Sequence, residues 1–297
     1  MKNFRRLIIL VLFGIILFSC NIEEVEKTEF VFETSRVLED YEMPNEDIEL
    51  LQQLGFAGSS GIVMEKTQIW NGGATYIYYL MEGDIEIRKD LLKSMVDELP
   101  KNGKVSQYRT ANLVGGPFPR TIRVIGMNMN NTTLQQGLTM AIQNYNNENI
   151  NLNFTLEFRT VTNIWQSISA VNDSDILAQQ YSGSAGGNSG FPSGGNPYAN
   201  VNVSTSTASF GTNVCENVFT HEIGHTIGLR HTDFFNRSIS CGGSFNNEGD
   251  TGVGAIHIPG TPATTSIDMN SIMLSCFNAG VTGEFSNFDV TALEGIY

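Results

Sequence analysis

Three of the chain's four histidines lie within residues 221 to 231, which read His-Glu-Ile-Gly-His-Thr-Ile-Gly-Leu-Arg-His. On a helix, residues four apart differ by about 40° in direction and about 6 Å in rise, so His221 and His225 can bind the same ion. His231 would lie about 15 Å along the axis of a continued helix and could not join them. Gly228 removes this difficulty, because glycine takes the left-handed conformation that ends a helix and turns the chain back. The spacing therefore predicts one metal ion bound by three imidazoles.

Glu222 follows the first of these histidines and predicts a catalytic rather than a structural site. Three neutral imidazoles around zinc leave a fourth position for water. Glu222 is offset from His221 by about 100° on a helix, so it is not a ligand of the same kind but can reach that water. We expect it to act as general base toward the zinc-bound water and then to carry the proton to a leaving amine. His257, alone in a Gly/Pro-rich loop, is interpreted as a surface or structural histidine.

The extended motif resembles the signature of the metzincin zinc peptidases. That family has a methionine-bearing turn beneath the metal. Residues 270 to 273 read Asn-Ser-Ile-Met, so the resemblance implies that Met273 forms the floor of the site; the alternative is a methionine packed in a core. Several metzincins carry a tyrosine two residues later. Ser275 occupies that position here, so no tyrosine role is carried over.

Within the metzincins, the motif and the Thr-Asp that follows His231 resemble the bacterial dual-action HEIGH metallopeptidase family. The resemblance extends over about residues 75 to 297. It implies an α+β, metzincin-like catalytic domain, with a twisted mixed sheet, a backing helix, an active-site helix and a mostly irregular C-terminal subdomain. It also implies zinc as cofactor, a protein or peptide as substrate, and peptide binding by strand addition along residues 201 to 204.

A second resemblance concerns the region before the catalytic domain. Residues 81 to 85 read Met-Glu-Gly-Asp-Ile and resemble the propeptide element of astacins, whose aspartate occupies the zinc until cleavage. This implies Asp84 as a latency ligand; the alternative is a plain turn of a small N-terminal domain.

Gly/Pro-rich stretches and the periodicity of apolar residues divide the chain into four parts. We expect a signal peptide over residues 1–19, an acidic tether over 20–45, a small pro-like domain over 46–116 and the catalytic domain over 117–297. The last boundary is placed at Gly115-Gly116-Pro117-Phe118-Pro119. The pro-like domain is expected to hold a helix over 47–54, a strand or hairpin over 74–87 and a helix over 87–99.

The catalytic part shows clearer patterns. A strand is predicted over 121–127, an amphipathic helix over 134–145 and an alternating strand over 152–158, an order typical of a crossover between parallel neighbours. Further strands are expected over 175–178 and 201–204, and a helix over 214–229. A short closing helix follows Ser286, which begins a capping box with Asp289.

The first residues have the layout of a secretory signal. A cationic lead precedes an apolar run from Leu7 to Phe18 that is too short to cross a bilayer comfortably. Leu17-Phe18-Ser19-Cys20 resembles the bacterial lipobox, which implies a lipid on Cys20 and an anchored protein in the cell envelope, at the outer membrane or cell surface. The alternative is an ordinary signal peptide with an incidental cysteine.

The net charge of the chain limits the class of macromolecule that it can bind. The net charge of −14 becomes −17 after residues 1–19 are removed, because they hold three basic and no acidic residues. Such a chain repels phosphate backbones, so nucleic acid is not an expected partner. We expect the protein to be a monomer.

Three cysteines remain after Cys20, and an odd number cannot all pair within the chain. We expect Cys241 and Cys276 to form a disulfide and Cys215 to be a buried thiol.

These observations together predict a lipid-anchored zinc metalloendopeptidase that acts on extracytoplasmic proteins or peptides. The alternative is a surface binding or adhesion module on the same scaffold with little or no turnover. An intact Glu222 favours the enzyme, because a purely structural site does not need that carboxylate.

Overall fold

The computed structural model describes residues 33–54, 56, 61–97, 107–249, 255–262 and 267–297. The expected signal peptide, Cys20 and the first part of the expected tether lie outside the described residues. Within those ranges, no helix is both long and apolar enough to cross a membrane.

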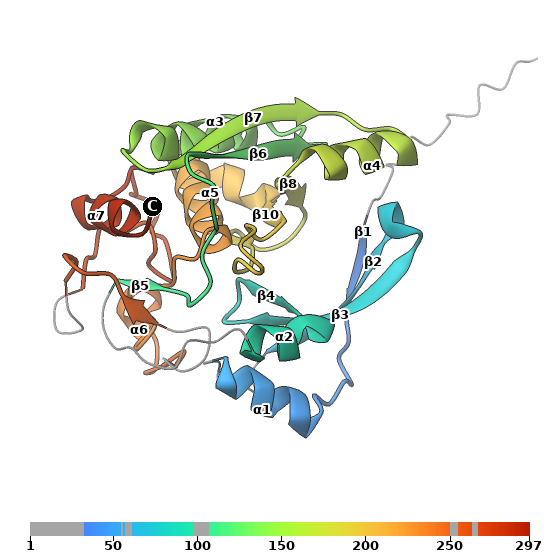
Figure 1. The fold of residues 1–297 in the computed structure, drawn as a ribbon, viewed down its shortest axis with the longest axis horizontal. Helices are drawn as coiled ribbons and strands as arrows, with labels where there is room; N and C mark the ends of the chain where they lie inside the picture. The colour runs from blue at the N-terminus through green and yellow to red at the C-terminus, as the bar shows by residue number, and fades with distance from the viewer. Residues whose placement is uncertain (1–32, 55, 57–60, 98–106, 250–254, 263–266) are drawn as a thin grey trace, which may run out of the picture.

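A five-stranded mixed sheet forms the frame of the larger part of the molecule (Figure 1). Its strand order is β7-β6-β8-β10-β9. The first four strands are parallel, and β9 pairs antiparallel with β10. The strands are β6 (Arg120–Met127), β7 (Leu152–Arg159), β8 (Ile176–Tyr181), β9 (Gly187–Asn188) and β10 (Asn200–Ser204). The mixed α+β fold predicted from the sequence is therefore confirmed.

Helices cover both faces of this sheet because its inner strand β6 is apolar on both sides. In β6, Ile122 and Val124 belong to the main core beneath α3 (Thr132–Asn147) and α5 (Thr212–Thr226). Ile125 and Met127 point to the other face, where they pack with residues around α4 (Ile164–Asp173). The predicted strand–helix–strand crossover is β6-α3-β7, whose strands are parallel neighbours. Helix α4 was not predicted.

The part after α5 is mostly irregular, as expected. It contains α6 (Ser238–Cys241), the short strand β11 (Ile256–His257) and α7 (Asn287–Ile296), whereas the 3-10 helix η3 (Thr205–Phe210) lies just before α5. Helix α7 begins with the predicted capping box. The Ser286 hydroxyl accepts from the Asp289 amide at 3.0 Å, and the Asp289 carboxylate accepts from the Ser286 amide at 3.0 Å.

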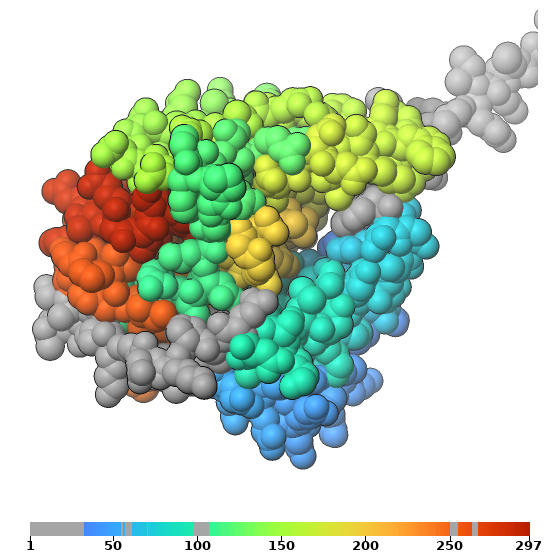
Figure 2. Space-filling model, viewed as in Figure 1, coloured from blue at the N-terminus to red at the C-terminus, as the bar shows by residue number. Residues whose placement is uncertain are grey.

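A separate four-stranded antiparallel sheet, β1-β2-β3-β4, forms the N-terminal unit with its own apolar core. Figure 2 shows its blue-to-cyan residues as one block beside the green-to-red remainder. Its elements are β1 (Glu33–Val37), α1 (Asn45–Gln53), β2 (Ile62–Gln68), η1 (Ile69–Asn71), β3 (Ala74–Met81), β4 (Ile85–Arg88), η2 (Lys89–Leu91) and α2 (Leu92–Asp97).

Two expectations for this unit need correction. Residues 33–37 are not part of a solvated tether, because they form the edge strand β1, paired with β2 from Glu33↔Gln68 to Val37↔Met64. The helix expected over 87–99 begins only at Leu92. Residues 85–88 instead pair with β3 as the second arm of a hairpin, because Ile85 and Ile87 are needed in the core of this sheet.

The boundary expected at residue 116/117 is also displaced. Strand β5 (Tyr108–Arg109) pairs with β11, and Val114 lies in the main core. The Thr110 amide donates to the Gly228 carbonyl at 2.7 Å. Residues 107–114 therefore belong structurally to the larger part. The Gly/Pro-rich stretch after them is a turn that leads into β6 rather than a junction between units.

Candidate metal centre and active site

Helix α5 carries the first two histidines and is buried on all sides from Val214 to Thr226. It ends at Thr226, three residues before the expected end at Leu229, and Gly228 is the residue that turns the chain, as predicted. Gly228 has φ +108°, its amide donates to the His225 carbonyl at 2.9 Å, and the Leu229 amide donates to the Gly224 carbonyl at 2.9 Å. This pair of bonds is a Schellman motif, which needs a residue with positive φ. The turn brings His231 back toward the helix.

The three Nε2 atoms converge on one point. The Nε2 of His225 lies 2.9 Å from that of His221 and 3.2 Å from that of His231, and the remaining pair is 3.3 Å apart. Nitrogens bound to zinc at about 2.0–2.1 Å in a tetrahedron are separated by roughly 3.3 Å. The three imidazoles therefore fit a single zinc ion.

Each imidazole is oriented by an acceptor at its other nitrogen. The Nδ1 atoms of His221 and His225 lie 2.8 Å from the carbonyls of Ile272 and Leu229, respectively. The Nδ1 of His231 lies 2.8 Å from a carboxylate oxygen of Glu248. These acceptors favour a proton on Nδ1 and a free lone pair on Nε2, as metal-binding histidines require. Burial, assisted by the neighbouring imidazoles, holds the pKa of His225 well below its usual value.

Met273, which the resemblance implies as the floor of the site, packs against the active-site helix between the two histidines of that helix. A Cβ on Gly224 would meet the Met273 sulfur at 2.7 Å, so this glycine lets the methionine approach the helix closely. The Met273 carbonyl accepts from the amide of Thr232, the residue after the third histidine, at 2.7 Å. Ser275 does not substitute for a tyrosine, because its hydroxyl donates to Asp233 at 2.8 Å and to Glu248 at 3.3 Å.

Glu222 lies beside the metal-binding group and is almost fully buried. One carboxylate oxygen, Oε2, accepts from the Ser189 hydroxyl at 2.8 Å. The other lies along Gly187, where a Cβ would meet Oε1 at 2.7 Å. Both glycine and carboxylate line a cleft of about 340 Å³. Burial, followed by the charge of Asp84, raises the pKa of Glu222 well above its usual value, which suits a group that must accept a proton.

Asp84 joins the three histidines, although it comes from the N-terminal unit. It lies at the tip of the β3–β4 hairpin, where Glu82 and Gly83 both have positive φ. Asp84 Oδ2 lies 2.9 Å from His231 Nε2 and 3.8 Å from His221 Nε2. Burial acts to raise the pKa of Asp84, but the facing His231 and His221 rings outweigh burial and hold this pKa well below its usual value. Asp84 can thus supply the fourth ligand atom of a metal site.

The backbone beside Asp84 extends the edge of the large sheet. The Ser189 amide donates to the Asp84 carbonyl at 2.9 Å, and the Glu86 amide donates to the Ser189 carbonyl at 2.7 Å. This corrects the expectation that residues 201–204 form the peptide-binding edge. Strand β10 is paired on both sides, with β8 and β9, and the outer strand is β9.

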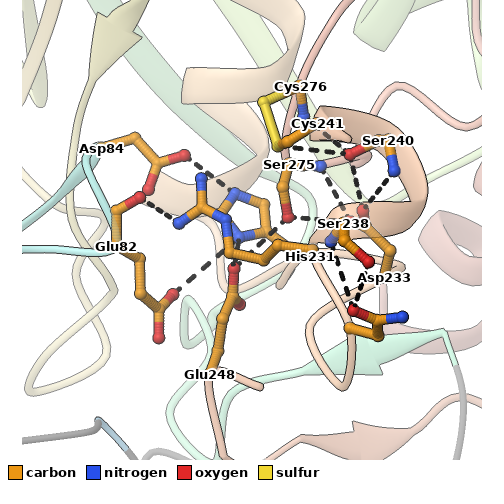
Figure 3. Close-up of a disulfide and its surroundings, with 12 residues drawn as sticks. Glu82, Asp84, His231, Asp233, Ser238, Ser240, Cys241, Glu248, Ser275 and Cys276 are labelled. Atoms are coloured by element: carbon orange, nitrogen blue, oxygen red, sulfur yellow. Dashed lines mark hydrogen bonds and ion pairs between the residues drawn. A yellow bond between two sulfur atoms is a disulfide. The ribbon is translucent and has the colours of Figure 1, made fainter. Parts of the chain in front are cut away.

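The disulfide joins Cys241 to Cys276, the pair that the sequence favoured, and Cys215 is a buried free thiol. Figure 3 shows this bridge close to Ser240, Ser275 and Asp233, with His231 and the hairpin tip on the other side. Asp233 is fully buried and ties the two segments together, since Oδ1 accepts from Ser275 and Oδ2 from Ser240. His257, the fourth histidine, lies in β11, contacts the Thr261 carbonyl and is not among the residues of the metal-binding group.

The family model described as dual-action HEIGH metallo-peptidase matches residues 78–297. The chain belongs to this family. Membership makes the protein a metallopeptidase, and the three-histidine donor set identifies its metal as zinc.

Several solved structures are similar to this metallopeptidase. Two structures of myroilysin share 14% and 13% sequence identity with it, with TM-scores of 0.38 and 0.37. These matches cover 62% and 68% of this chain and 82% and 95% of the myroilysin chains. High choriolytic enzyme 1, a hatching-enzyme zinc-protease of the medaka fish Oryzias latipes, shares 15% identity with a TM-score of 0.34, over 59% of this chain and 88% of its own. No curated protein matches the chain.

Some residues of this HEIGH metallopeptidase site carried no sequence signal. Ser189 is one serine of a Gly/Ser-rich loop, and Glu248 is one carboxylate of a Gly/Asn-rich stretch. Their roles depend on contacts with Glu222 and His231 that only the fold creates.

Proposed function

We propose that the protein is made as a latent zinc endopeptidase, which a lipid on Cys20 holds outside the cytoplasm. Once activated, it hydrolyses peptide bonds of extracytoplasmic proteins or peptides. The observation that carries the hydrolytic part is the convergence of three Nε2 atoms within 2.9–3.3 Å beside the Glu222 carboxylate.

The chain's own residues have distinct roles in this reaction. Zinc, when bound, would polarise the scissile carbonyl and lower the pKa of the attacking water. Glu222 takes a proton from that water and delivers it to the leaving amine. Ser189 holds one oxygen of this carboxylate, so the other remains directed along the cleft at Gly187. Glu248, Leu229 and Ile272 hold the imidazoles in the tautomer that binds metal.

Latency follows from the position of the β3–β4 hairpin. Asp84 lies where a fourth ligand would reach the metal, and the backbone bonds of Asp84 and Glu86 to Ser189 cover the edge beside the cleft. A peptide cannot use either position while the hairpin is in place. Activation therefore requires the N-terminal unit to leave, and the attachment of residues 107–114 to the larger part puts the cut before Gln107.

The location outside the cytoplasm rests on the lipobox-like sequence before Cys20 and on the disulfide, which persists in oxidising compartments. Cys20→Ser should release the protein from membranes. Mass spectrometry of the purified N-terminus should find an acylated Cys20, whereas an unmodified cysteine would contradict the anchor.

The hydrolytic proposal is tested with the full chain, before and after limited proteolysis removes the residues preceding Gln107. We expect one zinc per chain, and the cut protein should cleave quenched peptides. Glu222→Gln should retain zinc and lose activity by roughly 100-fold or more, the usual contribution of a general base. Equal hydrolysis by the cut wild type and the cut Glu222→Gln variant would contradict the role of Glu222. The alternative, a binding module, predicts that the wild type and the variant both bind zinc and that neither hydrolyses the peptides.

A further inference from the structure

Beside the metal centre, one residue of the hairpin tip is bound at both its side chain and its backbone. Arg230 Nη2 donates to the Glu82 carboxylate at 3.1 Å and 3.4 Å. Arg237 donates from Nη1 to the Glu82 main-chain carbonyl. The side chain of Glu82 is only 8% exposed. Two guanidinium groups thus bind a glutamate two residues away from the aspartate that faces the metal site. Figure 3 shows this glutamate, Glu82, beside Asp84.

We propose that Arg230 and Arg237 form a subsite for an acidic substrate residue. Glu82 fills it in the latent chain, and an aspartate or glutamate near the scissile bond fills it in the active enzyme. This inference rests on the proposed peptidase function and adds the class of substrate.

Arg230 is fixed by the larger part of the molecule and not only by Glu82. Its guanidinium carbon lies 5.9 Å from the ring centres of both Phe191 and Phe234, and 5.6 Å from that of Phe56. Among the described residues, Nε and Nη1 have no hydrogen-bond partner, so Nη2 alone binds carboxylates. Loss of the N-terminal unit removes Phe56 and Glu82 but leaves the other two rings. The guanidinium therefore stays at the position from which Glu82 departs.

The charge balance then favours an anion. Glu248 is the remaining carboxylate, and it is shared by His231, Arg230 at 3.4 Å and Arg237 at 3.3 Å. Without Glu82, one carboxylate faces two guanidinium groups and an imidazole. A buried cation without its partner is costly, so a substrate carboxylate that replaces Glu82 is strongly preferred over a neutral side chain. The same two cations disfavour a second metal ion among Glu82, His231 and Glu248.

The test uses the full chain processed by limited proteolysis, with removal of the N-terminal unit verified by mass. Quenched peptide pairs differ only by glutamate against glutamine within two residues of the cleaved bond. We expect kcat/KM to favour the glutamate peptide by about 10- to 100-fold, as a charge-assisted bond allows. Arg237→Gln and Arg230→Gln should each reduce this ratio to about threefold or less. Arg123→Gln, an exposed arginine paired with Asp175, should leave it unchanged.

A binding measurement separates this inference from the peptidase proposal. In processed protein carrying Glu222→Gln, fluorescence anisotropy should show a Kd for the glutamate peptide about tenfold or more below that for the glutamine peptide. Equal kcat/KM and equal Kd for the two peptides would overturn the subsite while leaving the peptidase intact. Absence of hydrolysis with retained discrimination in binding would overturn the peptidase assignment and leave the acidic subsite standing.

Discussion

Asp289 accepts a hydrogen bond from the backbone amide of Ile272 at 2.9 Å, and the Ile272 carbonyl in turn lies 2.8 Å from His221 Nδ1. The first residue is in the last helix and the second is in the turn before Met273. The carboxylate also accepts from the Ser271 hydroxyl at 2.6 Å and from the Ser286 amide at 3.0 Å. Asp289 therefore fixes the backbone of Ile272 and, through its carbonyl, the orientation of the His221 ring.

Asp289→Asn should weaken both the fold and the metal site. The substituted amide has only one acceptor oxygen, so either the Ile272 and Ser286 amides or the Ser271 hydroxyl would lose their acceptor. We expect a loss of about 2–4 kcal/mol in the free energy of unfolding and roughly tenfold weaker zinc binding. Denaturant titration and competition with a zinc chelator would measure these effects. Glu294→Gln, an exposed change on the same helix, is the control. Unchanged zinc affinity in Asp289→Asn would contradict the coupling.

Gly228→Ala should damage the turn that returns His231. At φ +108°, a Cβ would meet Leu113 Cδ2 at 2.7 Å and the Asn112 carbonyl at 3.0 Å. Gly242 also has positive φ, but its Cβ would have nothing within 4 Å. Gly242→Ala should therefore lower the free energy of unfolding by about 1–2 kcal/mol, the effect of backbone strain alone. Gly228→Ala should lower it by more and should also lower zinc occupancy. Thermal unfolding and metal analysis of the two variants would test this difference; equal behaviour would argue against it.

Asp84→Ala should relieve part of the latency of the uncut chain. Removing the carboxylate opens the fourth metal position, although the backbone bonds to Ser189 remain. We expect basal hydrolysis of small peptides by the uncut chain to rise about tenfold, comparable with the loss of one metal-directed contact. Asp97→Ala changes an exposed aspartate of the same unit and should leave the rate as it is. No rise in rate for Asp84→Ala, measured with zinc fully bound, would exclude Asp84 as the latency ligand.

Cys215 should make the stability of the protein depend on alkaline pH. Burial raises the pKa of its thiol to about 11 from 9.0. Because the folded-state value is the higher one, the stabilising effect of the neutral thiol is complete below about pH 9 and is lost as pH rises through about 11. The difference in unfolding free energy between wild type and Cys215→Ala should therefore shrink between pH 8 and pH 11. A constant difference over this range would show that the thiol titrates normally.

The sequence predicted the parts of the molecule whose signal is local. The amphipathic pattern of α3, the alternation in β7 and the glycine that ends α5 each depend on residues within one or two turns. The same holds for the zinc motif, because His221, His225 and Glu222 are placed by helix geometry alone.

The missed parts depend on partners far away in the chain. Strand β2 contains Lys66, which reads as a surface residue, yet it is buried against Glu86 and its charge is compensated there. Strand β1 is mostly exposed, lacks an alternating pattern and lies within the acidic stretch of residues 21–50, so it resembled part of a tether. Strand β9 has only two residues in a Gly/Ser-rich loop, too few for any periodic signal.

The connection formed by residues 107–114 has a practical consequence for anyone who makes shorter versions of this enzyme. The Arg230 amide donates to the Tyr108 carbonyl at 2.8 Å, and the Thr110 amide donates to the Gly228 carbonyl at 2.7 Å, so this stretch buttresses the bend between the second and third histidines from outside. A recombinant fragment that starts at Pro117 would omit that brace and leave the bend unsupported. The minimal expression product should start no later than Gln107.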